Sequence, residues 1–364
     1  RAVKAHRNAK VVVVGCYAVS DRAEVEAIEG VDLVLGNNEK ERLAEVLGNR
    51  IAIAPLLQIA PFRRPEPTLG RVRANLKVQT GCDEWCTFCI IPKTRGELRS
   101  MDEDRLIEEA TARVASGARE LVLTGVHLGK YDFDRGGDEH SLVRLLRRLL
   151  EIEGVWRLRL SSILCRHLTP AVVSFMQEEP RVCRYLHVPL QSGDDGILAA
   201  MHRPYNAAEY IDTIDRVKEA VPDVALATDI IVGFPGETEA AFAATEAMVD
   251  RIGFSKLHVF RYSARAGTAA AGMTDEVHPD VKRDRSKRLI ARGAALRDRF
   301  LRNHLGRPLQ VLVEDERVVD GESICSGQTD DYVRVWFSGK ALLGRMVDVI
   351  ADEIRADGLK GRVA

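Results

Sequence analysis

The sequence predicts an α/β fold: an incomplete (β/α)6 barrel, preceded by a partial doubly wound α/β domain and followed by a small β-barrel. Two patterns support this prediction. Apolar strand-like segments alternate with helix-like segments between residues 76 and 260, and short strand-like segments alone follow residue 309. The expected domains are residues 1–54, a linker at 55–70, the (β/α) barrel at 71–304 and the β-barrel at 305–364.

The amino-terminal domain is predicted from two apolar runs and two helix-like segments. Residues 11–16 form a β-branched run typical of a buried parallel strand, and residues 31–36 are expected to form a second strand. Helices are expected at 20–28 and 38–47, which completes a strand–helix–strand–helix order. Residues 55–67 hold four prolines without periodicity, which indicates an interdomain linker.

The (β/α) barrel is predicted from six strand-like segments, each separated from the next by helix-like sequence. The strands are expected at residues 76–80, 120–124, 157–161, 186–190, 227–232 and 256–260, and the helices at 102–115, 142–151, 170–178, 207–220 and 239–252. A long helix rich in Arg and Lys follows at 281–304, and it reads equally as a solvated face or as an RNA contact. Strands of the small β-barrel are expected at 309–313, 332–337 and 344–350.

Three cysteines, Cys82, Cys86 and Cys89, follow the first barrel strand in a CxxxCxxC spacing. The carboxyl end of a strand is where an α/β barrel keeps its chemistry. Three thiolates suit an iron–sulfur cluster, and because a full cage normally has four, one iron would stay open for a ligand. A zinc knuckle is the alternative, but the next histidine is His127, far beyond knuckle spacing. An odd number of cysteines and the absence of any sign of secretion argue against disulfides.

This cysteine motif resembles the signature of the radical S-adenosylmethionine (SAM) enzymes. The run Cys86-Thr87-Phe88-Cys89-Ile90-Ile91-Pro92, followed by Arg95-Gly96 and Arg99-Ser100, is similar to the methylthiotransferase branch. Residues 121–129, Leu-Val-Leu-Thr-Gly-Val-His-Leu-Gly, are similar to the subgroup that modifies threonylcarbamoyladenosine in tRNA. The resemblance extends from about residue 9 to about residue 353.

The resemblance implies a chemistry as well as a fold. It assigns a [4Fe-4S] cluster to Cys82, Cys86 and Cys89, with SAM on the open iron. An external electron donor would drive the cleavage of SAM to methionine and a 5'-deoxyadenosyl radical. The reaction implied is addition of a methylthio group to C2 of the adenosine at position 37, beside the anticodon. The expected partner is therefore the tRNA anticodon loop, whose unpaired bases can be splayed out.

Further site residues come from strand ends that match the family. Thr124, Gly125 and His127 would contact the methionine part of SAM or the substrate, and Gln191, Ser192 and Gly193 would contact ribose or substrate. Gly233 and Gly236 lie in Ile-Ile-Val-Gly-Phe-Pro-Gly-Glu-Thr, the segment beside which the family places the adenine of SAM, and Arg203 matches a family position near the site. The alternatives are an ordinary strand-to-helix turn, a structural histidine and a surface arginine.

Cys16 matches the third of three family cysteines that hold an auxiliary [4Fe-4S] cluster. The other two would precede Arg1, so we expect an amino-terminally truncated chain in which that second cluster is incomplete. Leu164 stands where relatives commonly carry Glu, so a polar contact is missing from that position. The remaining cysteines show no ligand spacing and are expected to be ordinary thiols: Cys165, Cys183 and Cys325.

Composition constrains partners and location. A formal net charge of −1 gives no global support for RNA binding. The carboxyl-terminal segment resembles the TRAM domain, which helps to bind tRNA in this family, although its acidic residues outnumber its basic ones. No apolar run approaches a membrane span and clustered reduced cysteines fit the cytoplasm, so no membrane partner is expected.

Three other functions remain open at this stage. Two belong to the same family: methylthiolation of isopentenyladenosine in tRNA, and methylthiolation of an aspartate of a ribosomal protein. The motif at residues 124–129 argues against both. The third is a zinc-dependent RNA-binding module without enzymatic activity, which would contain zinc and lack acid-labile sulfide.

Overall fold

The computed structural model describes residues 10–37, 39 and 71–364. The chain divides into two compact units. The first unit comprises Arg1–Glu66, Thr80–Leu98 and Ala264–Gly272, and the second comprises Pro67–Gln79, Arg99–Ser263 and Met273–Ala364. The cysteine motif therefore lies in the first unit and the predicted barrel strands lie in the second.

The first unit contains a parallel pair of short strands, β1 (Val12–Val14) and β2 (Leu33–Leu35), as predicted. The helix expected at 20–28 is instead two short helices, α2 (Tyr17–Ser20) and α3 (Arg22–Glu26), because the backbone of Asp21 leaves the helical region between them. The expectation of a buried β1 is wrong at its end, where Val14 is 46% exposed. The helix predicted at 38–47 and the linker at 55–70 lie outside the described residues.

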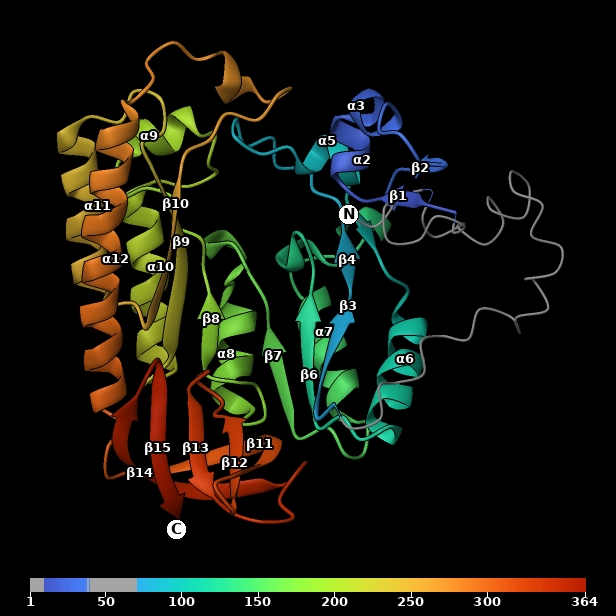
Figure 1. The fold of residues 1–364 in the computed structure, drawn as a ribbon, viewed down its shortest axis with the longest axis vertical. Coiled ribbons are helices and arrows are strands. Elements are labelled where there is room, and N and C mark those ends of the chain that lie inside the picture. Colours follow the sequence, from blue (N-terminus) through green and yellow to red (C-terminus); the bar gives the residue numbers. More distant parts are fainter. Residues whose placement is uncertain (1–9, 38, 40–70) are drawn as a thin grey trace, which may run out of the picture. The chain divides into compact units, whose positions relative to one another are not determined.

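The second unit contains six parallel barrel strands in two three-stranded sheets (Figure 1). The first sheet consists of β3 (Arg73–Lys77), β6 (Glu120–Thr124) and β7 (Arg157–Leu160), and the second of β8 (Tyr185–His187), β9 (Ala225–Val232) and β10 (Lys256–Arg261). Isolated parallel bridges, Leu158 to Val182 and Ser162 to His187, join the two sheets. The six strands therefore lie side by side in the order of the sequence, as expected for the predicted (β/α) barrel.

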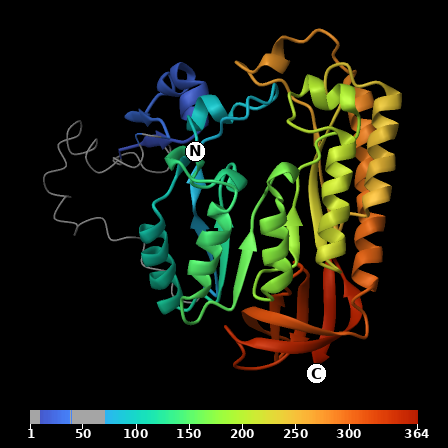
Figure 2. The ribbon, with the colours of Figure 1, turned by 180° about the vertical axis from the view of Figure 1, so that it is seen from behind.

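Helices cover one face of these sheets (Figures 1 and 2). They are α6 (Glu103–Ala115), α7 (Ser141–Leu150), α8 (Pro170–Glu178), α10 (Ala207–Ala220), α11 (Glu239–Ile252) and α12 (Pro279–Arg302), with the shorter α9 (Asp195–Ala200). A buried core of mostly Leu, Val and Ile side chains joins helices and strands. The strand predicted at 76–80 is split, because β3 ends at Lys77 and β4 (Gln79–Thr80) follows it, while β5 (Arg99–Ser100) comes after the cysteine motif.

The carboxyl-terminal segment closes into a five-stranded barrel in the order β11-β12-β13-β15-β14. Its strands are β11 (Pro308–Val319), β12 (Glu322–Gln328), β13 (Arg334–Ser338), β14 (Met346–Arg355) and β15 (Gly358–Val363). The sequence analysis did not predict β12 or β15, whose glycines weaken the strand pattern. At Gly361 a Cβ atom would lie 2.2 Å from the carbonyl oxygen of Ile350, so close strand packing requires glycine there.

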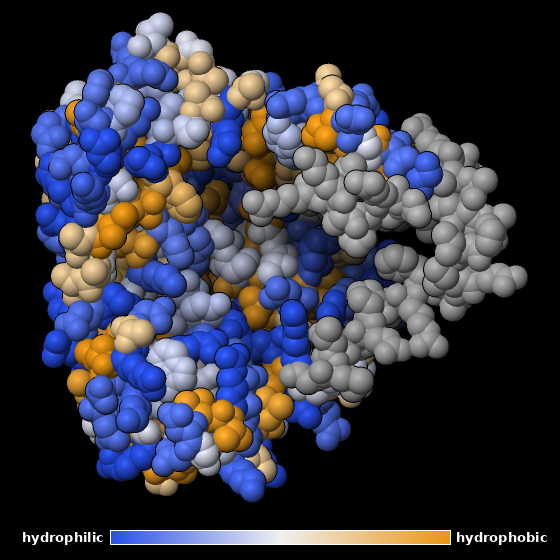
Figure 3. Space-filling model, viewed as in Figure 1, coloured by the Kyte–Doolittle hydropathy of each residue, from blue (hydrophilic) through white to orange (hydrophobic). Residues whose placement is uncertain are grey.

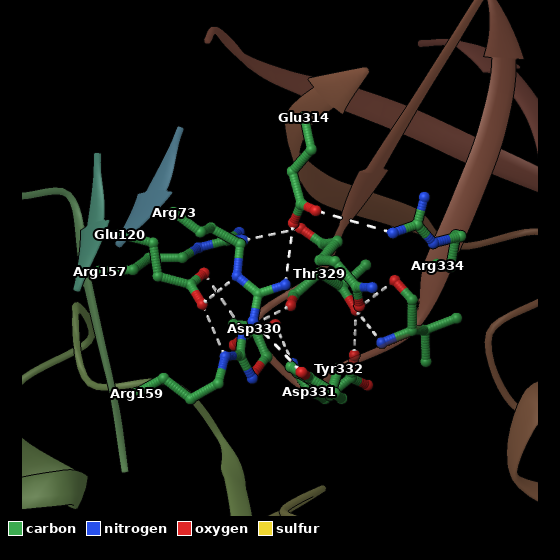
Figure 4. Close-up of polar contacts among 12 residues, drawn as sticks. Arg73, Glu120, Arg157, Arg159, Glu314, Thr329, Asp330, Asp331, Tyr332 and Arg334 are labelled. Carbon is green, nitrogen blue, oxygen red and sulfur yellow. Dashed lines mark hydrogen bonds and ion pairs between the residues drawn. The ribbon is translucent and has the colours of Figure 1, made fainter. Parts of the chain in front are cut away.

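A buried polar network joins this small barrel to the first sheet within the second unit (Figure 4). Arg157 of β7 donates to the carbonyl oxygens of Gln328 and Gln310, at 2.9 and 2.7 Å. Arg159 donates to the carbonyl oxygens of Asp330 and Thr329, at 2.8 and 3.0 Å. Because these donors are buried and satisfied by backbone, the small barrel is fixed at the amino-terminal ends of the strands.

Among the described residues, none of the helices combines the length and the apolar character that crossing a bilayer requires. The face shown in Figure 3 is mostly hydrophilic, with separate apolar patches.

Candidate functional site

The cysteine motif lies on a loop whose backbone is fixed within the first unit. Gly81 begins the loop at a φ of +72°, and a Cβ there would lie 1.8 Å from the carbonyl oxygen of Glu97, so only glycine fits. The amide of Cys82 donates to the carbonyl of Gly96 at 3.2 Å, which closes the loop at its base. The short helix α5 (Ile91–Arg95) follows, with Pro92 in its first turn.

The three motif cysteines are partly or fully buried, and no disulfide joins the described cysteines. Burial raises the pKa of the Cys82 thiol to about 11, and the nearby sulfur atoms of Cys86 and Cys89 add to the rise. A bound cation would offset this rise, because it favours the deprotonated sulfur. Three cysteines on one loop are a donor set that fits a cluster held through three thiolates.

Cys16 lies in the same unit, beside the helix that follows the motif. The amide nitrogen Nδ2 of Asn37 donates to Sγ of Cys16 at 3.3 Å and to the carbonyl oxygen of Thr94 at 2.8 Å. Burial would raise the pKa of Cys16, but hydrogen bonds from Asn37, Arg95 and Thr94 outweigh burial and lower that pKa. The environment thus favours the thiolate, the form that binds metal.

Gly233 and Gly236 form the turn between β9 and α11 in the second unit, with φ of +71° and +80°. A Cβ on Gly233 would lie 2.3 Å from the side chain of Lys282, which explains the glycine. The turn is fastened by Glu237, whose carboxylate accepts from the amide of Gly233 and from Nη1 of Arg285, both at 2.7 Å. The sequence did not reveal this buried pair, since Arg285 lies on α12, far along the chain.

Thr124 is the last residue of β6, at the strand end as predicted, and Gly125 and His127 follow it and lie close to Gln79. The amide of His127 donates to Oε1 of Gln79 at 2.7 Å, and the His127 side chain is 3% exposed. Its ring lies 5.0 Å from the ring of His167 in an edge-on arrangement. This buried position fits both the structural and the ligand-contact interpretation of His127.

Gln191, Ser192, Gly193 and Arg203 have structural roles that the sequence did not specify. Gly193 lies so close to α11 that a Cβ would be 2.7 Å from Cα of Thr245, and its amide donates to Oγ1 of Thr245. Gln191 adopts a φ of +68°, and Nε of Arg203 donates to the hydroxyl of Tyr205 at 3.0 Å. These contacts account for the positions of Gly193 and Arg203, and the cofactor role of all four residues stays a prediction.

Polar residues also occupy the face of the second sheet that no helix covers. Nε2 of His187 lies 3.1 Å from Oδ1 of Asp229, and the ring of His258 meets the ring of His187 edge-on at 5.6 Å. Burial lowers the pKa of His258. The sequence analysis missed this group, although polar residues at alternating positions of apolar strands are a readable signal.

Comparison with known proteins agrees with this geometry. The Radical SAM superfamily matches residues 76–249. Threonylcarbamoyladenosine tRNA methylthiotransferase MtaB of Bacillus subtilis is 37% identical over 96% of this chain and 80% of its own length. The chain belongs to the radical SAM methylthiotransferase family. The family prediction made from the cysteine motif and residues 121–129 is thereby confirmed.

Two other members of this family show the same breadth of similarity. MtaB of Thermotoga maritima is 35% identical over 92% of this chain and 77% of its own length. A tRNA-2-methylthio-N(6)-dimethylallyladenosine synthase, from Acidothermus cellulolyticus, is 37% identical over 95% of this chain and 71% of its own length. Membership implies a [4Fe-4S] cluster and SAM as cofactors, and the three clustered cysteines fit that requirement.

Proposed function

We propose that this protein is a tRNA methylthiotransferase that adds a methylthio group to C2 of N6-threonylcarbamoyladenosine at position 37. The observation that carries the proposal is similarity over nearly the whole chain to relatives named for this reaction, 37% and 35% identical. The CxxxCxxC loop supplies the thiolates that radical SAM chemistry requires.

Cys82, Cys86 and Cys89 would hold the cluster, whose role is to supply the electron that cleaves SAM. The residues around the loop fix its shape: Gly81 permits the tight approach to Glu97, and the carbonyl of Thr87 accepts from the amide of Ala270 at 2.9 Å. In the second unit, Glu237 and Arg285 fix the Gly233 turn. A rigid turn presents its backbone to SAM without having to be ordered on binding.

Cys16 would bind the auxiliary [4Fe-4S] cluster that takes part in sulfur delivery. The lowered pKa of its thiol supports this role, because a thiolate is the ligating form. A [4Fe-4S] cluster normally has several cysteine ligands, so Cys16 would be one of a set.

The proposal also includes the domain boundaries, the partners, the location and the ligand contacts. The domain boundaries proposed are 1–54, 55–70, 71–304 and 305–364, and the closed barrel of β11 to β15 is proposed to be a TRAM domain. The tRNA anticodon loop is the proposed substrate, an external donor supplies the electron, and the enzyme acts in the cytoplasm. The ligand contacts of Thr124, Gly125, His127, Gln191, Ser192, Gly193, Arg203, Gly233 and Gly236 belong to this proposal.

A second candidate is methylthiolation of the dimethylallyl form of the same adenosine. A relative named for that reaction is also 37% identical to this chain. The two substrates differ only in the group on N6, so the specificity depends on the residues that surround that group.

Mass spectrometry of tRNA nucleosides tests the proposal. Cells that lack the gene should lose the methylthio form of threonylcarbamoyladenosine and accumulate the unmethylthiolated form. Restoring the gene should reverse the change, whereas the Cys82→Ala variant should not. Loss of the methylthio dimethylallyl nucleoside instead would assign the second candidate, and an unchanged nucleoside profile would exclude both.

A further inference from the structure

One strip of side chains lies on the uncovered face of the second sheet and has no role in the machinery described above. It consists of His187 on β8, Asp229 on β9, and His258 and Phe260 on β10. We call it the inner strip. Its residues are half-buried or exposed, whereas their strand neighbours Leu186 and Ile230 belong to the core.

The register of the strands places these residues on one face. His258 pairs with Asp229 and Phe260 pairs with Ile231 in the parallel ladder of β10 and β9. Alternate residues of a strand point to the same face, so His258 and Phe260 share theirs. Leu257, the residue before His258, packs against Gly293 of α12 on the opposite face.

The chemistry of the inner strip is unusual for a barrel interior. Such interiors are normally filled by branched apolar side chains. Here a carboxylate and an imidazole lie 3.1 Å apart with side chains 26% and 19% exposed, so solvent reaches both. Phe260 is 52% exposed although it lies at the carboxyl end of a strand, the end where barrel enzymes bind substrate.

An exposed aromatic ring next to hydrogen-bonding groups is the arrangement with which proteins hold an unstacked base. Bases of single-stranded RNA stack on aromatic side chains and are read by hydrogen bonds at their edges. Asp229 can accept hydrogen bonds from an amino group or a ribose hydroxyl, and the histidines can donate or accept. A purine on Phe260 would place its polar edge toward these groups.

We propose that the inner strip binds the adenosine that is modified, with the purine on Phe260 and its polar groups toward Asp229 and His258. This proposal rests on the proposed function and names the residues that position its substrate. Among the residues that the family resemblance assigns to SAM, Gly233 and Gly125 lie in turns beyond strand ends. Asp229 and His258 lie within strands, so the inner strip is a separate set of contacts.

Binding of two RNA hairpins to the whole reconstituted chain tests the proposal. One hairpin carries adenosine at position 37 of an anticodon-type loop, and the other has an abasic residue there. We expect the chain to prefer the adenosine hairpin by about tenfold, the gain that stacking of one base provides. Phe260→Leu should abolish the preference and leave affinity for the abasic hairpin unchanged, whereas Phe260→Trp should retain the preference.

Asp229→Asn should reduce the same preference severalfold. Two control variants should keep it: Asp215→Asn, which removes a carboxylate paired with Arg251 on the helical face, and Ile290→Ala, which truncates an exposed side chain of α12. The ratio between two RNAs is insensitive to partial misfolding, because inactive protein lowers both affinities alike. SAM affinity should be unchanged in the Phe260 and Asp229 variants.

Three results would overturn the proposal. The first is no preference for adenosine in the unmodified chain, and the second is a preference that survives Phe260→Leu and Asp229→Asn. The third is a loss of SAM affinity in these variants with the RNA preference intact, which would give the inner strip to SAM. The proposed function fails separately, when no methylthio nucleoside depends on the gene.

Discussion

Arg159 and Glu120 form a buried ion pair with two contacts at the amino-terminal ends of β7 and β6. Nε of Arg159 lies 2.7 Å from Oε1 of Glu120, and Nη2 lies 3.2 Å from Oε2 (Figure 4). The Nη1 atom of the same guanidinium donates to the carbonyl of Asp330 in the small barrel. One side chain therefore couples the strand ends of the first sheet to the carboxyl-terminal barrel.

The first prediction concerns this pair. Arg159→Ala leaves Glu120 buried without its main partner, and breaking a buried pair costs roughly 3–5 kcal/mol. We expect the free energy of unfolding, measured in urea, to fall by about that amount. Arg251→Ala is the control, since its ion pair with Asp215 is exposed, and it should have a far smaller effect. Similar losses in the two variants would contradict the coupling role of Arg159.

The same pair predicts an acid dependence. Burial would raise the pKa of Glu120, but the guanidinium groups of Arg159 and Arg73 outweigh burial and hold it below its usual value. A carboxyl whose pKa is lowered on folding stabilises the fold above its unfolded pKa, about 4.3, and the stabilisation is lost as pH falls through the folded value. The difference between the parent chain and Arg159→Ala should therefore shrink in acid.

A second prediction follows from His304 and Asp331, whose side chains pair where α12 meets the small barrel. Burial would lower the pKa of His304, but Asp331 and the carbonyl of Phe300 raise it above its usual value. The stabilisation is fully present below the unfolded pKa, about 6.5, and is lost as pH rises through the folded value. The melting temperature should fall over this range, less so in His304→Gln. His278→Gln, an exposed control, should behave as the parent chain.

The sequence predicts a helix or strand of this fold well where the residues that determine it are neighbours in the chain. The helices at 170–178, 207–220 and 239–252 were predicted to the residue, because Thr169, Asn206 and Thr238 cap their first turns. β15 was missed because its packing depends on Gly358 and Gly361, which read as turn residues. The sequence analysis assigned no role to the buried arginines of β7, since their carbonyl partners lie far along the chain.

The residues of the candidate site also fall into those that local sequence reveals and those that it does not. The cysteine spacing is local, so the sequence revealed Cys82, Cys86 and Cys89 directly. The pairing of Glu237 with Arg285 joins a turn to a distant helix, and that of His187 with Asp229 joins two strands. Such pairs need the register of the fold, which no single stretch of sequence contains.

A third prediction concerns the Gly233 turn. Glu237→Gln keeps the shape of the side chain but removes the charge that faces the buried Arg285, so the turn should loosen. We expect the dissociation constant of SAM to rise about tenfold, since a hydrogen bond to a charged group contributes roughly 1.5–3 kcal/mol. Glu239→Gln is the matched control, because Glu239 also pairs with Arg285 but is 63% exposed. If both variants bind SAM as the parent chain does, the turn does not position SAM.

The last prediction concerns the cysteine loop. Replacing Cys82, Cys86 and Cys89 with Ala removes every thiolate of the motif, so anaerobic reconstitution should yield neither cluster absorbance nor 5'-deoxyadenosine. The parent chain should bind about four irons at this motif, with matching acid-labile sulfide. Cys183→Ala is the control. Cys183 is 1% exposed, lies in the second unit and is not at ligand spacing from another cysteine, so its loss should leave the iron content unchanged. Stoichiometric zinc without sulfide in the parent chain, or SAM cleavage by the triple variant, would show that the motif is not a radical SAM centre.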